Sequence, residues 1–365
     1  MKKRDFSILI VIGARPQFIK YAPLAKELNK IKNLNQIVVH TGQHYDKNMS
    51  TVFFDELGIP EPNINLNINN FSRGKMIGKM IDKIEEVIIE YSPDLVIIFG
   101  DTNSTLAAAV ASSSFNLNLM HIESGLRSFN KYMPEEHNRI VADHLSNILC
   151  VTSEEPRKNL INEGFSKEKI FLTGDIMLDT FLLNKQEINK RNCYKKFGLK
   201  KNNYIICTIH RQENTHSIQR LTNIFKSLNY ISRNISQVII PLHPATKNKL
   251  SKIKIDLSNI KIIDPTSYLD FMSLVAHSNY VITDSGGLQK EAFYLEKQSL
   301  VLRTESEWVE LSQSGNSILV NPNNYDNILH AASTLFDKKI VNKDLYGDGT
   351  AAIKISKIIN NLMSD

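Results

Sequence analysis

The sequence is poor in cysteine and has no long apolar run. Its 365 residues contain three cysteines, Cys150, Cys193 and Cys207, which are too scattered for a disulfide framework and show no CxxC or Cys/His metal spacing. No window approaches the roughly 18 uninterrupted apolar residues of a membrane-spanning helix. The sequence therefore argues against redox chemistry, a metal site and a membrane protein, and we expect a soluble chain.

Two glycine-rich nucleotide motifs are also missing. A Rossmann dinucleotide site needs GxGxxG near the first strand, but GARPQF carries a single glycine, Gly13. The chain contains no GxxxxGK[ST] loop either. These absences argue against a dehydrogenase and against an NTPase, and we expect no cofactor.

The amino terminus, MKKRDFSILIVIGARP, places basic residues before an apolar run, as a signal peptide does. The run has only about seven residues, lacks a small-residue cleavage site and continues into GARP, so we interpret it as the first strand and expect a cytoplasmic protein. The net charge of +6 is spread along the chain without interleaved aromatic residues. This pattern argues against nucleic-acid binding and suits an anionic small molecule.

Short runs rich in Ile and Val alternate with longer amphipathic segments, and this alternation predicts the fold class. Runs that are apolar on both alternating faces indicate strands buried on both sides, as in parallel sheets covered by helices. We therefore predict an α/β protein with doubly wound, Rossmann-like domains. The predicted strands are Ser7–Ile12, Asn35–His40, Leu95–Phe99, Leu117–Ile122, Ile148–Val151, Tyr204–Ile209, Val238–Leu242, Ile260–Ile263, Tyr280–Thr283 and Ser299–Leu302.

Helical periodicity predicts helices over Ala22–Ile31, Met76–Tyr91 and Leu106–Ala111. A break is predicted near Phe165–Gly174, where a helix ends at Gly164 and a charged SKEK segment leads to a short strand and TGD. We therefore place one domain at residues 1–170 and a second at 171–350. The Asn-rich stretch at 63–70 is interpreted as a loop.

Polar and charged residues follow the predicted strands of both domains at the same end. In an open α/β sheet, ligands bind at the carboxyl ends of the strands. This common position predicts a ligand cleft between two facing domains. The segments are GARPQFIK, HTGQHYD, GDTNST, ESGLR, HRQEN, HPATK and DSGG.

Of these segments, DSGGLQKEA, residues 284 to 292, has the clearest chemical interpretation. Two glycines after a strand let the backbone approach a ligand, and a helix predicted from about Leu288 directs unpaired N–H groups at an anion such as a pyrophosphate. Glu291, one turn further on, could accept hydrogen bonds from ribose hydroxyls. An ordinary strand-to-helix turn explains this motif equally well when it is taken alone.

Six motifs, taken in order, resemble one family along essentially the whole chain: GARPQFIKYAPL, GDTNSTLAAA, HIESGLRS, PEEHNRI, HRQEN and TDSGGLQKEA. They resemble the non-hydrolysing UDP-N-acetylglucosamine 2-epimerases. The resemblance implies the two-domain architecture of GT-B glycosyltransferases, with UDP held mainly by the second domain and a carboxy-terminal helix, Ala351–Met363, packed on the first. It also implies inversion of C2 by elimination of UDP to a 2-acetamidoglucal and re-addition. The implied partner is a UDP-sugar, and we expect a homodimer.

The same resemblance suggests catalytic residues. Asp101, Glu123 and Glu135 match the family's catalytic carboxylates, and His210 matches its essential histidine. Both Glu135 and its neighbour Glu136 follow Pro134, where carboxylates are also ordinary partners of a helix dipole. We predict a catalytic Glu135 and a helping Glu136, and which carboxylate serves which face of C2 is left open.

Further residues match the family's substrate contacts. Taken alone, Phe271 would be assigned to a core and Arg15 to solvent. The predicted UDP-sugar contacts are Arg15, Lys20, Arg139, Phe271, Ser285, Gly286, Gly287 and Glu291. Arg127 is predicted to lie near the acids, and His243 either faces the site or caps the helix that follows it. Gln43 and His44 fit a region where some family members bind a second UDP-sugar.

Two segments depart from the best-known members: SFNKYM, between GLR and PEE, and LRTESEWVEL, after the SGG helix. They are more similar to the branch that acts on modified UDP-sugars such as diacetamido uronic acids. We predict interconversion of UDP-GlcNAc and UDP-ManNAc, with such a modified sugar or a hydrolysing 2-epimerase as alternatives. A GT-B glycosyltransferase or a nucleotide-sugar sensor without turnover would not need the complete set of acids.

Overall fold

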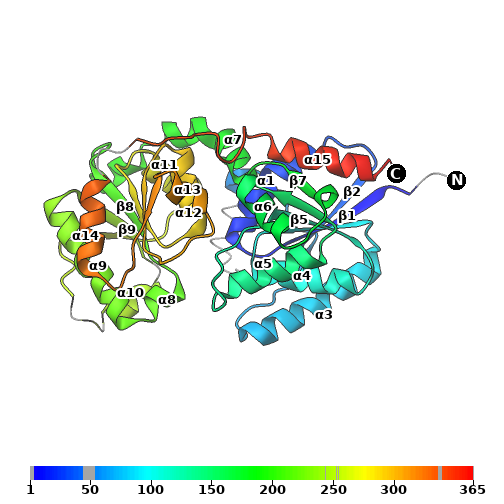
Figure 1. Cartoon of the computed structure of the whole chain (residues 1–365), viewed down its shortest axis with the longest axis horizontal. Coiled ribbons are helices and arrows are strands. Elements are labelled where there is room, and N and C mark those ends of the chain that lie inside the picture. The colour runs from blue at the N-terminus through cyan, green and yellow to red at the C-terminus, as the bar shows by residue number, and fades with distance from the viewer. Residues whose placement is uncertain are drawn as a thin grey trace. The chain divides into compact units, whose positions relative to one another are not determined.

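The computed structural model of the chain describes residues 4–43, 54–242, 244–251, 253, 255–335 and 339–364. The chain divides into two compact units, each with its own sheet (Figure 1). The first unit comprises Met1–Leu183 and Tyr346–Asp365, and the second comprises Asn184–Leu345. The prediction of an α/β protein with parallel sheets is confirmed.

Within the described residues, the first unit contains a seven-stranded parallel sheet in the order β3-β2-β1-β4-β5-β6-β7. Because the chain runs outward from β1 in one direction and then from β4 in the other, the sheet is doubly wound, and the carboxyl ends of β1 and β4 form its switch point. Its strands are β1 (Phe6–Ile12), β2 (Leu34–His40), β3 (Ile64–Asn65), β4 (Leu95–Phe99), β5 (Asn118–Ser124), β6 (Ile148–Val151) and β7 (Ile170–Leu172).

Helices cover both faces of this sheet, as the doubly apolar strands require. All five residues of β4 are fully buried. Figure 1 shows α3, α4 and α5 gathered on one side of the sheet and α1 and α15 on the other. The helices of this unit are α1 (Arg15–Leu28), α3 (Arg73–Tyr91), α4 (Asn103–Ser113), α5 (Pro134–Leu145), α6 (Glu154–Asn162), the 3-10 turn η1 (Lys167–Lys169), α7 (Ile176–Lys190, which continues into the second unit) and α15 (Ala351–Leu362).

α1 continues through a proline because another helix takes up the backbone group that the proline leaves unpaired. Pro23 has no N–H to donate to the carbonyl of Ile19, four residues earlier. That carbonyl instead accepts a hydrogen bond of 2.7 Å from the hydroxyl of Thr180 in α7. α1 and α7 are thereby joined within the first unit.

The carboxy-terminal helix α15 packs against α1 and is anchored at its first turn. The buried carboxylate of Asp179 in α7 accepts hydrogen bonds from the backbone N–H groups of Ala351 (3.2 Å) and Ala352 (2.7 Å). Burial raises the pKa of Asp179 to about 6. The last helix of the chain is therefore held to the first unit by a titratable group.

The second unit is built around a parallel sheet in the order β10-β9-β8-β11-β12-β13, again doubly wound. One core cluster lies between this sheet and α9 and α14, and another lies between the sheet and α11 and α12. The strands are β8 (Tyr204–Thr208), β9 (Gln237–Pro241), β10 (Lys261–Ile263), β11 (Val281–Thr283), β12 (Ser299–Val301) and β13 (Ser317–Leu319). The helices are η2 (Cys193–Phe197), α8 (Gln212–Thr215), α9 (Ile218–Asn234), α10 (Pro244–Leu250), α11 (Tyr268–Ala276), α12 (Gly286–Tyr294), α13 (Val309–Gln313) and α14 (Tyr325–Thr334).

Some elements differ from the sequence expectation. The stretch 63–70, predicted to be a loop, includes β3, and β13 was not predicted. The expected domain boundary between residues 170 and 171 falls inside β7, which pairs with β6 as the last strand of the first sheet. In the described part of the chain, none of the helices combines the length and apolar character that a bilayer crossing requires.

Candidate active site

Glu123 lies at the carboxyl end of β5, where the strand leaves its regular register. The pairing of β5 with β6 shifts between Ile122 and Ser124, and Glu123 has a φ of 72°. A bulge at a strand end re-aims a side chain, and a glutamate is held in the left-handed region only by its surroundings. The buried carboxylate forms an ion pair with the equally buried ammonium group of Lys20.

The turn after β4 touches this ion pair at Gly100, whose φ is 61°. A methyl group at Gly100 would lie 2.9 Å from the ammonium nitrogen of Lys20 and 3.3 Å from a carboxylate oxygen of Glu123. Only glycine combines this backbone conformation with so close an approach. The ends of β4 and β5 and the side chain of Lys20 from α1 therefore meet at one point.

The two cations predicted near the first strand belong to a helix, not to a loop. α1 begins at Arg15 and not at Ala22, because Pro16 favours the first turn and the side chain of Gln17 accepts hydrogen bonds at the helix start. Arg15 is half-buried at the first helical position, and Lys20 lies on the buried face of the next turn.

Asp101, directly after Gly100, pairs with Arg139 of α5. The Asp101 side chain is 31% exposed, whereas that of Arg139 is only 2% exposed. The second terminal nitrogen of Arg139 lies 2.7 Å from a carboxylate oxygen of Glu136. Arg139 is therefore held between two carboxylates, and Asp101 keeps one side open to solvent.

Glu136 orders the loop after β5. Its carboxylate accepts hydrogen bonds from the backbone N–H of Ser128 (2.9 Å), the Ser128 hydroxyl (2.9 Å) and the backbone N–H of Phe129 (2.9 Å). Those contacts and Arg139 account for the buried position of Glu136. Glu135, one residue earlier in the first turn of α5, is half-buried.

Arg127 forms ion pairs with acids other than the candidate carboxylates Asp101, Glu123 and Glu135. It donates to both carboxylate oxygens of Glu163 (2.7 and 2.6 Å) and to Asp143 (2.7 Å), and its side chain is 1% exposed. Burial by itself raises the pKa of Asp143, but His121 and Arg127 together bring it below its ordinary value. Arg127 thus belongs to a buried charge cluster beneath the strand ends.

Gln17 was not predicted, yet it ties the switch point of the first sheet together. Its side-chain oxygen accepts from the backbone N–H of Gly13 (2.8 Å) and Ala14 (3.1 Å). Its amide nitrogen donates to the Phe99 carbonyl (3.2 Å) and to the Thr105 hydroxyl (3.1 Å). The glutamine four residues after the strand-end glycine was the available signal.

The predicted second-sugar region is partly described. Gln43 accepts hydrogen bonds from the backbone N–H (3.1 Å) and hydroxyl (2.8 Å) of Ser104, at the start of α4. His44 and His243 lie outside the described residues.

In the second unit, the start of α12 has the geometry of an anion site. Ser285 caps the helix through a hydrogen bond from the N–H of Leu288 (3.4 Å), and Gly286 and Gly287 form the first turn. The helix therefore begins at Gly286, earlier than the predicted Leu288. A methyl group at Gly286 would lie 2.3 Å from a carboxylate oxygen of Glu307, so that the Glu307 side chain would have to shift to admit it.

The loop carrying His210 is held by Asp284, the fully buried residue between β11 and this helix. Asp284 accepts from the backbone N–H groups of His210 (3.1 Å) and Arg211 (3.0 Å) and from the side chain of Asn214 (3.1 Å). The Nδ1 atom of His210 lies 3.3 Å from Asp284, and the His210 side chain is 60% exposed. Asp284 thus fixes an imidazole that faces outward at the end of β8.

The other predicted nucleotide contacts lie around the same helix. Glu291 is 7% exposed, one turn after the glycines. The ammonium group of Lys290, a residue that is fully buried, lies 3.9 Å from the centre of the Trp308 ring. Phe271 of α11 is half-buried and packs on the core cluster beneath α12.

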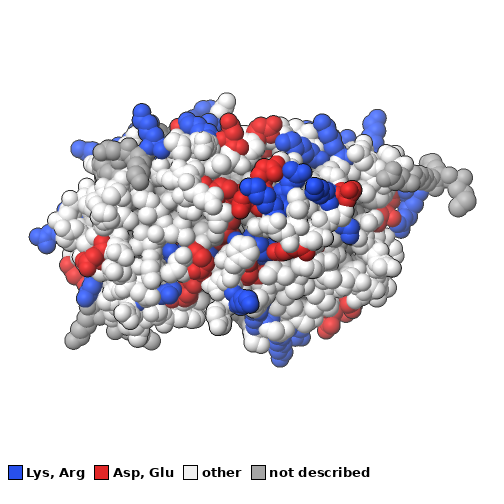
Figure 2. Space-filling view, in the orientation of Figure 1, with Lys and Arg blue, Asp and Glu red and all other residues white. Residues whose placement is uncertain are grey.

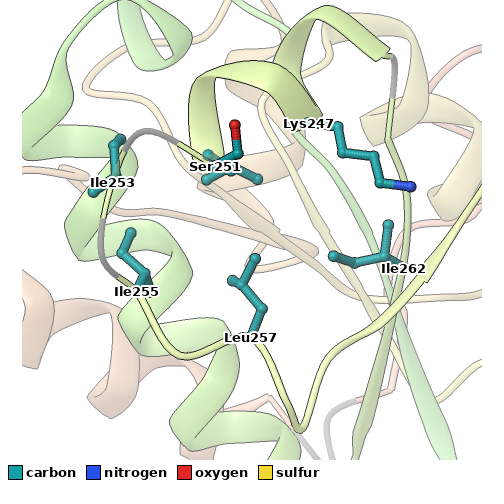
Figure 3. A pocket seen from close by; sticks show the side chains of 7 residues that line it. Lys247, Ser251, Ile253, Ile255, Leu257 and Ile262 are labelled. Carbon is teal, nitrogen blue, oxygen red and sulfur yellow. The ribbon is translucent and has the colours of Figure 1, made fainter.

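Two surface features are separate from these residues. Figure 2 shows Lys and Arg interspersed with Asp and Glu on the visible face, a mixture that does not form a single-sign field. A hollow at the edge of the second unit is lined by aliphatic side chains that also pack on its core (Figure 3). Its lining residues are Lys247, Leu250, Ser251, Ile253, Ile255, Leu257 and Ile262.

Comparison with known proteins identifies the family. The sequence profile described as UDP-N-acetylglucosamine 2-epimerase matches residues 26–360. The chain is 42% identical over 362 residues to a UDP-N-acetylglucosamine 2-epimerase homolog of Methanococcus maripaludis, with 97% of this chain and 99% of that protein covered. It is 43% identical over 359 residues to the UDP-2,3-diacetamido-2,3-dideoxy-D-glucuronate 2-epimerase of Pseudomonas aeruginosa, with the same coverage.

A solved structure agrees with both sequence matches. The structure of Methanocaldococcus jannaschii UDP-GlcNAc 2-epimerase in complex with UDP-GlcNAc and UDP superimposes with a TM-score of 0.92 at 35% identity, covering 98% of this chain and 100% of that one. Two parallel α/β sheets and full-length similarity define a UDP-sugar epimerase with a fold of the GT-B type. The chain belongs to the UDP-N-acetylglucosamine 2-epimerase family. The family, fold and epimerase predictions are confirmed, whereas the roles of individual residues stay predictions.

Proposed function

We propose that this enzyme interconverts UDP-GlcNAc and UDP-ManNAc without net hydrolysis. The observation that carries the proposal is the full-length similarity to an epimerase whose structure holds UDP-GlcNAc and UDP. In the proposed reaction, a carboxylate removes the C2 proton and the C1–O bond breaks. UDP then leaves with the electron pair, and a 2-acetamidoglucal remains. UDP adds back to C1 while C2 is protonated on the opposite face.

The strand ends of the first unit supply the acids and cations that this reaction needs. Glu123 is buried beside Lys20, whereas Asp101 is partly exposed beside Arg139. Carboxylates in such different surroundings can take opposite acid and base roles, as the two faces of C2 demand. Glu135 is the third proposed carboxylate, and the assignment of each to a face stays open.

The second unit supplies a place for the leaving diphosphate. The N–H groups and the positive dipole end of α12 at Ser285, Gly286 and Gly287 favour a negative ligand. His210 presents its ring outward at the end of the neighbouring strand β8, held there by Asp284. We assign the diphosphate to this helix start, Glu291 to the ribose and Phe271 to the uracil.

A second substrate is favoured by one observation. The identity to the Pseudomonas aeruginosa diacetamido-glucuronate epimerase, 43%, exceeds the 35% identity to the UDP-GlcNAc epimerase of Methanocaldococcus jannaschii. UDP-2,3-diacetamido-2,3-dideoxyglucuronate is therefore the alternative sugar for the same C2 chemistry.

Proton NMR of the purified enzyme in deuterated water tests both candidates. With UDP-GlcNAc, we expect deuterium at C2 and the appearance of UDP-ManNAc, with UDP-sugar conserved. Free ManNAc and stoichiometric UDP would contradict the non-hydrolysing reaction. No exchange with UDP-GlcNAc, but exchange with the diacetamido uronate, would assign the enzyme to the alternative sugar.

A further inference from the structure

His121, two residues before Glu123 in β5, is completely buried and lies between two hydrogen-bond acceptors. Its Nε2 atom is 2.8 Å from the carbonyl oxygen of Gly100, and its Nδ1 atom is 2.7 Å from a carboxylate oxygen of Asp143. A carbonyl oxygen can only accept, and so can an ionised carboxylate. Both contacts are satisfied together when each ring nitrogen carries a hydrogen.

The surroundings of the ring keep Asp143 ionised. Its other carboxylate oxygen accepts from a terminal nitrogen of Arg127 (2.7 Å) and from the backbone N–H of Gly125 (3.1 Å). With His121 and Arg127 beside it, the pKa of Asp143 is lowered despite complete burial. The charged groups packed around His121 are Asp143 from α5, Arg127 from the loop after β5, and Glu163, which pairs with Arg127. Arg127 thus pairs with both carboxylates of this cluster.

The acceptor on the other side of the ring belongs to the turn that carries the site. The N–H of Gly100 donates to the carbonyl of Ile122 (2.9 Å), so β5 holds both polar groups of Gly100, one through its backbone and one through His121. Gly100 contacts the Lys20–Glu123 ion pair, and Asp101 follows it directly. This peptide therefore sets the position of Asp101 and lies against the Lys20–Glu123 ion pair.

We propose that His121, protonated on both ring nitrogens, is a positioning residue that fixes the Gly100–Asp101 turn for the epimerisation. The expected effect on kcat rests on the proposed function, whereas the expected effect on the orientation of the Gly100 carbonyl does not. The histidine touches none of the reacting atoms in this scheme. It acts through the carbonyl of Gly100, and the Asp143 carboxylate, itself held by Arg127, fixes the opposite side of the ring.

The first test is kinetic. Glutamine at position 121 can still donate to one acceptor but cannot donate to both. For His121→Gln we expect kcat to fall about 100-fold while the KM for the UDP-sugar stays within about threefold, since the proposed diphosphate contacts lie in the other unit. The matched control is His144→Gln in α5, an exposed histidine whose Nδ1 atom lies 2.8 Å from the Ile140 carbonyl and whose ring packs edge-on against Phe165. A His121→Gln enzyme with an unchanged kcat would overturn the proposal.

The second test does not depend on activity. In the full-length protein labelled with ¹⁵N-histidine, each ring nitrogen of His121 should show a one-bond coupling to its own hydrogen, because each faces an acceptor. A ring nitrogen without a bonded hydrogen would overturn the proposal. A crystal structure of His121→Gln should show a rotated Gly100 carbonyl and a displaced Asp101, and an unchanged turn would again contradict us. If the wild-type enzyme epimerised no UDP-sugar, the proposed function would fail while these two measurements still decided the role of His121.

A variant that does not fold would be replaced by Asp143→Asn, which keeps an acceptor for Nδ1–H and removes the negative charge. We expect His121 to lose one of its two ring hydrogens near neutral pH in this variant, together with a drop in kcat. Retention of both hydrogens with full activity would show that the ring needs no charged partner and would refute the proposed mechanism.

Discussion

At the scale of single residues, Glu123 is held in a backbone conformation that a glutamate avoids. Its φ of 72° costs of order 1–3 kcal/mol, which the fold must offset elsewhere. The strain coincides with a strand-end bulge and with a buried ion pair to Lys20. We infer that this conformation holds the Glu123 carboxylate beside the carboxyl ends of the strands. A regular strand would point the side chain in a different direction.

Glu123→Gln tests this inference directly. Because an amide can neither remove nor deliver the C2 proton, we expect kcat to fall by about a thousandfold or more. UDP affinity, measured by calorimetry, should stay within about twofold, because the proposed phosphate, ribose and uracil contacts of the second unit are unchanged and Arg15 and Lys20 are still present. Glu90→Gln, at an exposed carboxylate near the end of α3, is the matched control and should behave like the wild type. Normal epimerisation by the Glu123 variant would remove this residue from the mechanism.

Gly13 gives a prediction about stability at the same scale. A methyl group there would lie 1.9 Å from the hydroxyl oxygen of Thr41 and 2.4 Å from that of Ser104, two groups that are bonded to each other at 2.8 Å. Gly13→Ala should therefore lower the free energy of unfolding by about 2 kcal/mol or more, read from urea denaturation. Gly78→Ala, on the exposed side of α3 with open space around it, should instead raise it by about 0.5–1 kcal/mol. Equal midpoints for the two variants would show that the packing at Gly13 can relax.

At the scale of elements, the strands were more predictable than the helix starts. Continuous apolar runs fixed Leu95–Phe99 and Ile148–Val151 to the residue, because strands buried on both faces leave an unbroken pattern. β3 and β13 escaped prediction because they are short, at two and three residues, and lie at sheet edges, where half-exposed sequences resemble loops.

The starts of α1 and α12 were predicted too late for a related reason. Proline and glycine usually interrupt regular structure, so their presence predicts helices that begin only after them. In the structure Pro16 and Gly286 lie in the first turn, because the side chains of Gln17 and Ser285 satisfy the helix starts. Such caps depend on side-chain geometry, which the order of residues does not show.

The attachment of α15 leads to a pH prediction. Burial raises the pKa of Asp179 from 3.8 to about 6, so between these values the folded protein binds a proton that the unfolded chain has released. The free energy of unfolding must therefore fall as pH rises from about 4 to 6 and level off above, by about 3 kcal/mol for a shift of this size.

The comparison with Asp179→Asn isolates this contribution from that of other acids. The difference in unfolding free energy, wild type minus variant, should decrease by about 2–3 kcal/mol between pH 4 and pH 7 when followed by circular dichroism. A constant difference would mean that the two N–H groups of α15 stabilise the carboxylate as much as burial penalises it, and an increase with pH would mean that they stabilise it more.

At the scale of the whole molecule, the sequence pointed to the candidate residues, but not to the hydrogen-bond partners that hold them in place. Strand-end polarity and the family resemblance pointed to Asp101, Glu123, His210 and the glycines of α12. Nothing in the sequence paired His121 with Asp143, which lies 22 positions further along the chain, or Asp284 with the His210 loop. These partners are set by which strands become neighbours, so they emerge only when the sheets are assembled.

The second unit should be able to fold by itself. Its two core clusters consist entirely of residues between positions 193 and 335, on both faces of one sheet. The first unit, by contrast, needs its own carboxy-terminal segment, because α15 is anchored by Asp179 and packs on α1.

We therefore expect a fragment of residues 184–345 to unfold cooperatively, and a fragment of residues 1–345 to be less stable in its first unit than the full chain.

The 184–345 fragment should also bind UDP, because it contains the start of α12. Its affinity should be up to about tenfold weaker than that of the whole enzyme, owing to the loss of Lys20 and Arg15. Calorimetric titration with UDP measures this, and Gly286→Ala, which would drive a methyl group into Glu307, is the control that should abolish binding. A folded fragment that does not bind UDP would contradict the assignment of the nucleotide site to α12, because the proposed phosphate, ribose and uracil contacts of the second unit are all present in it.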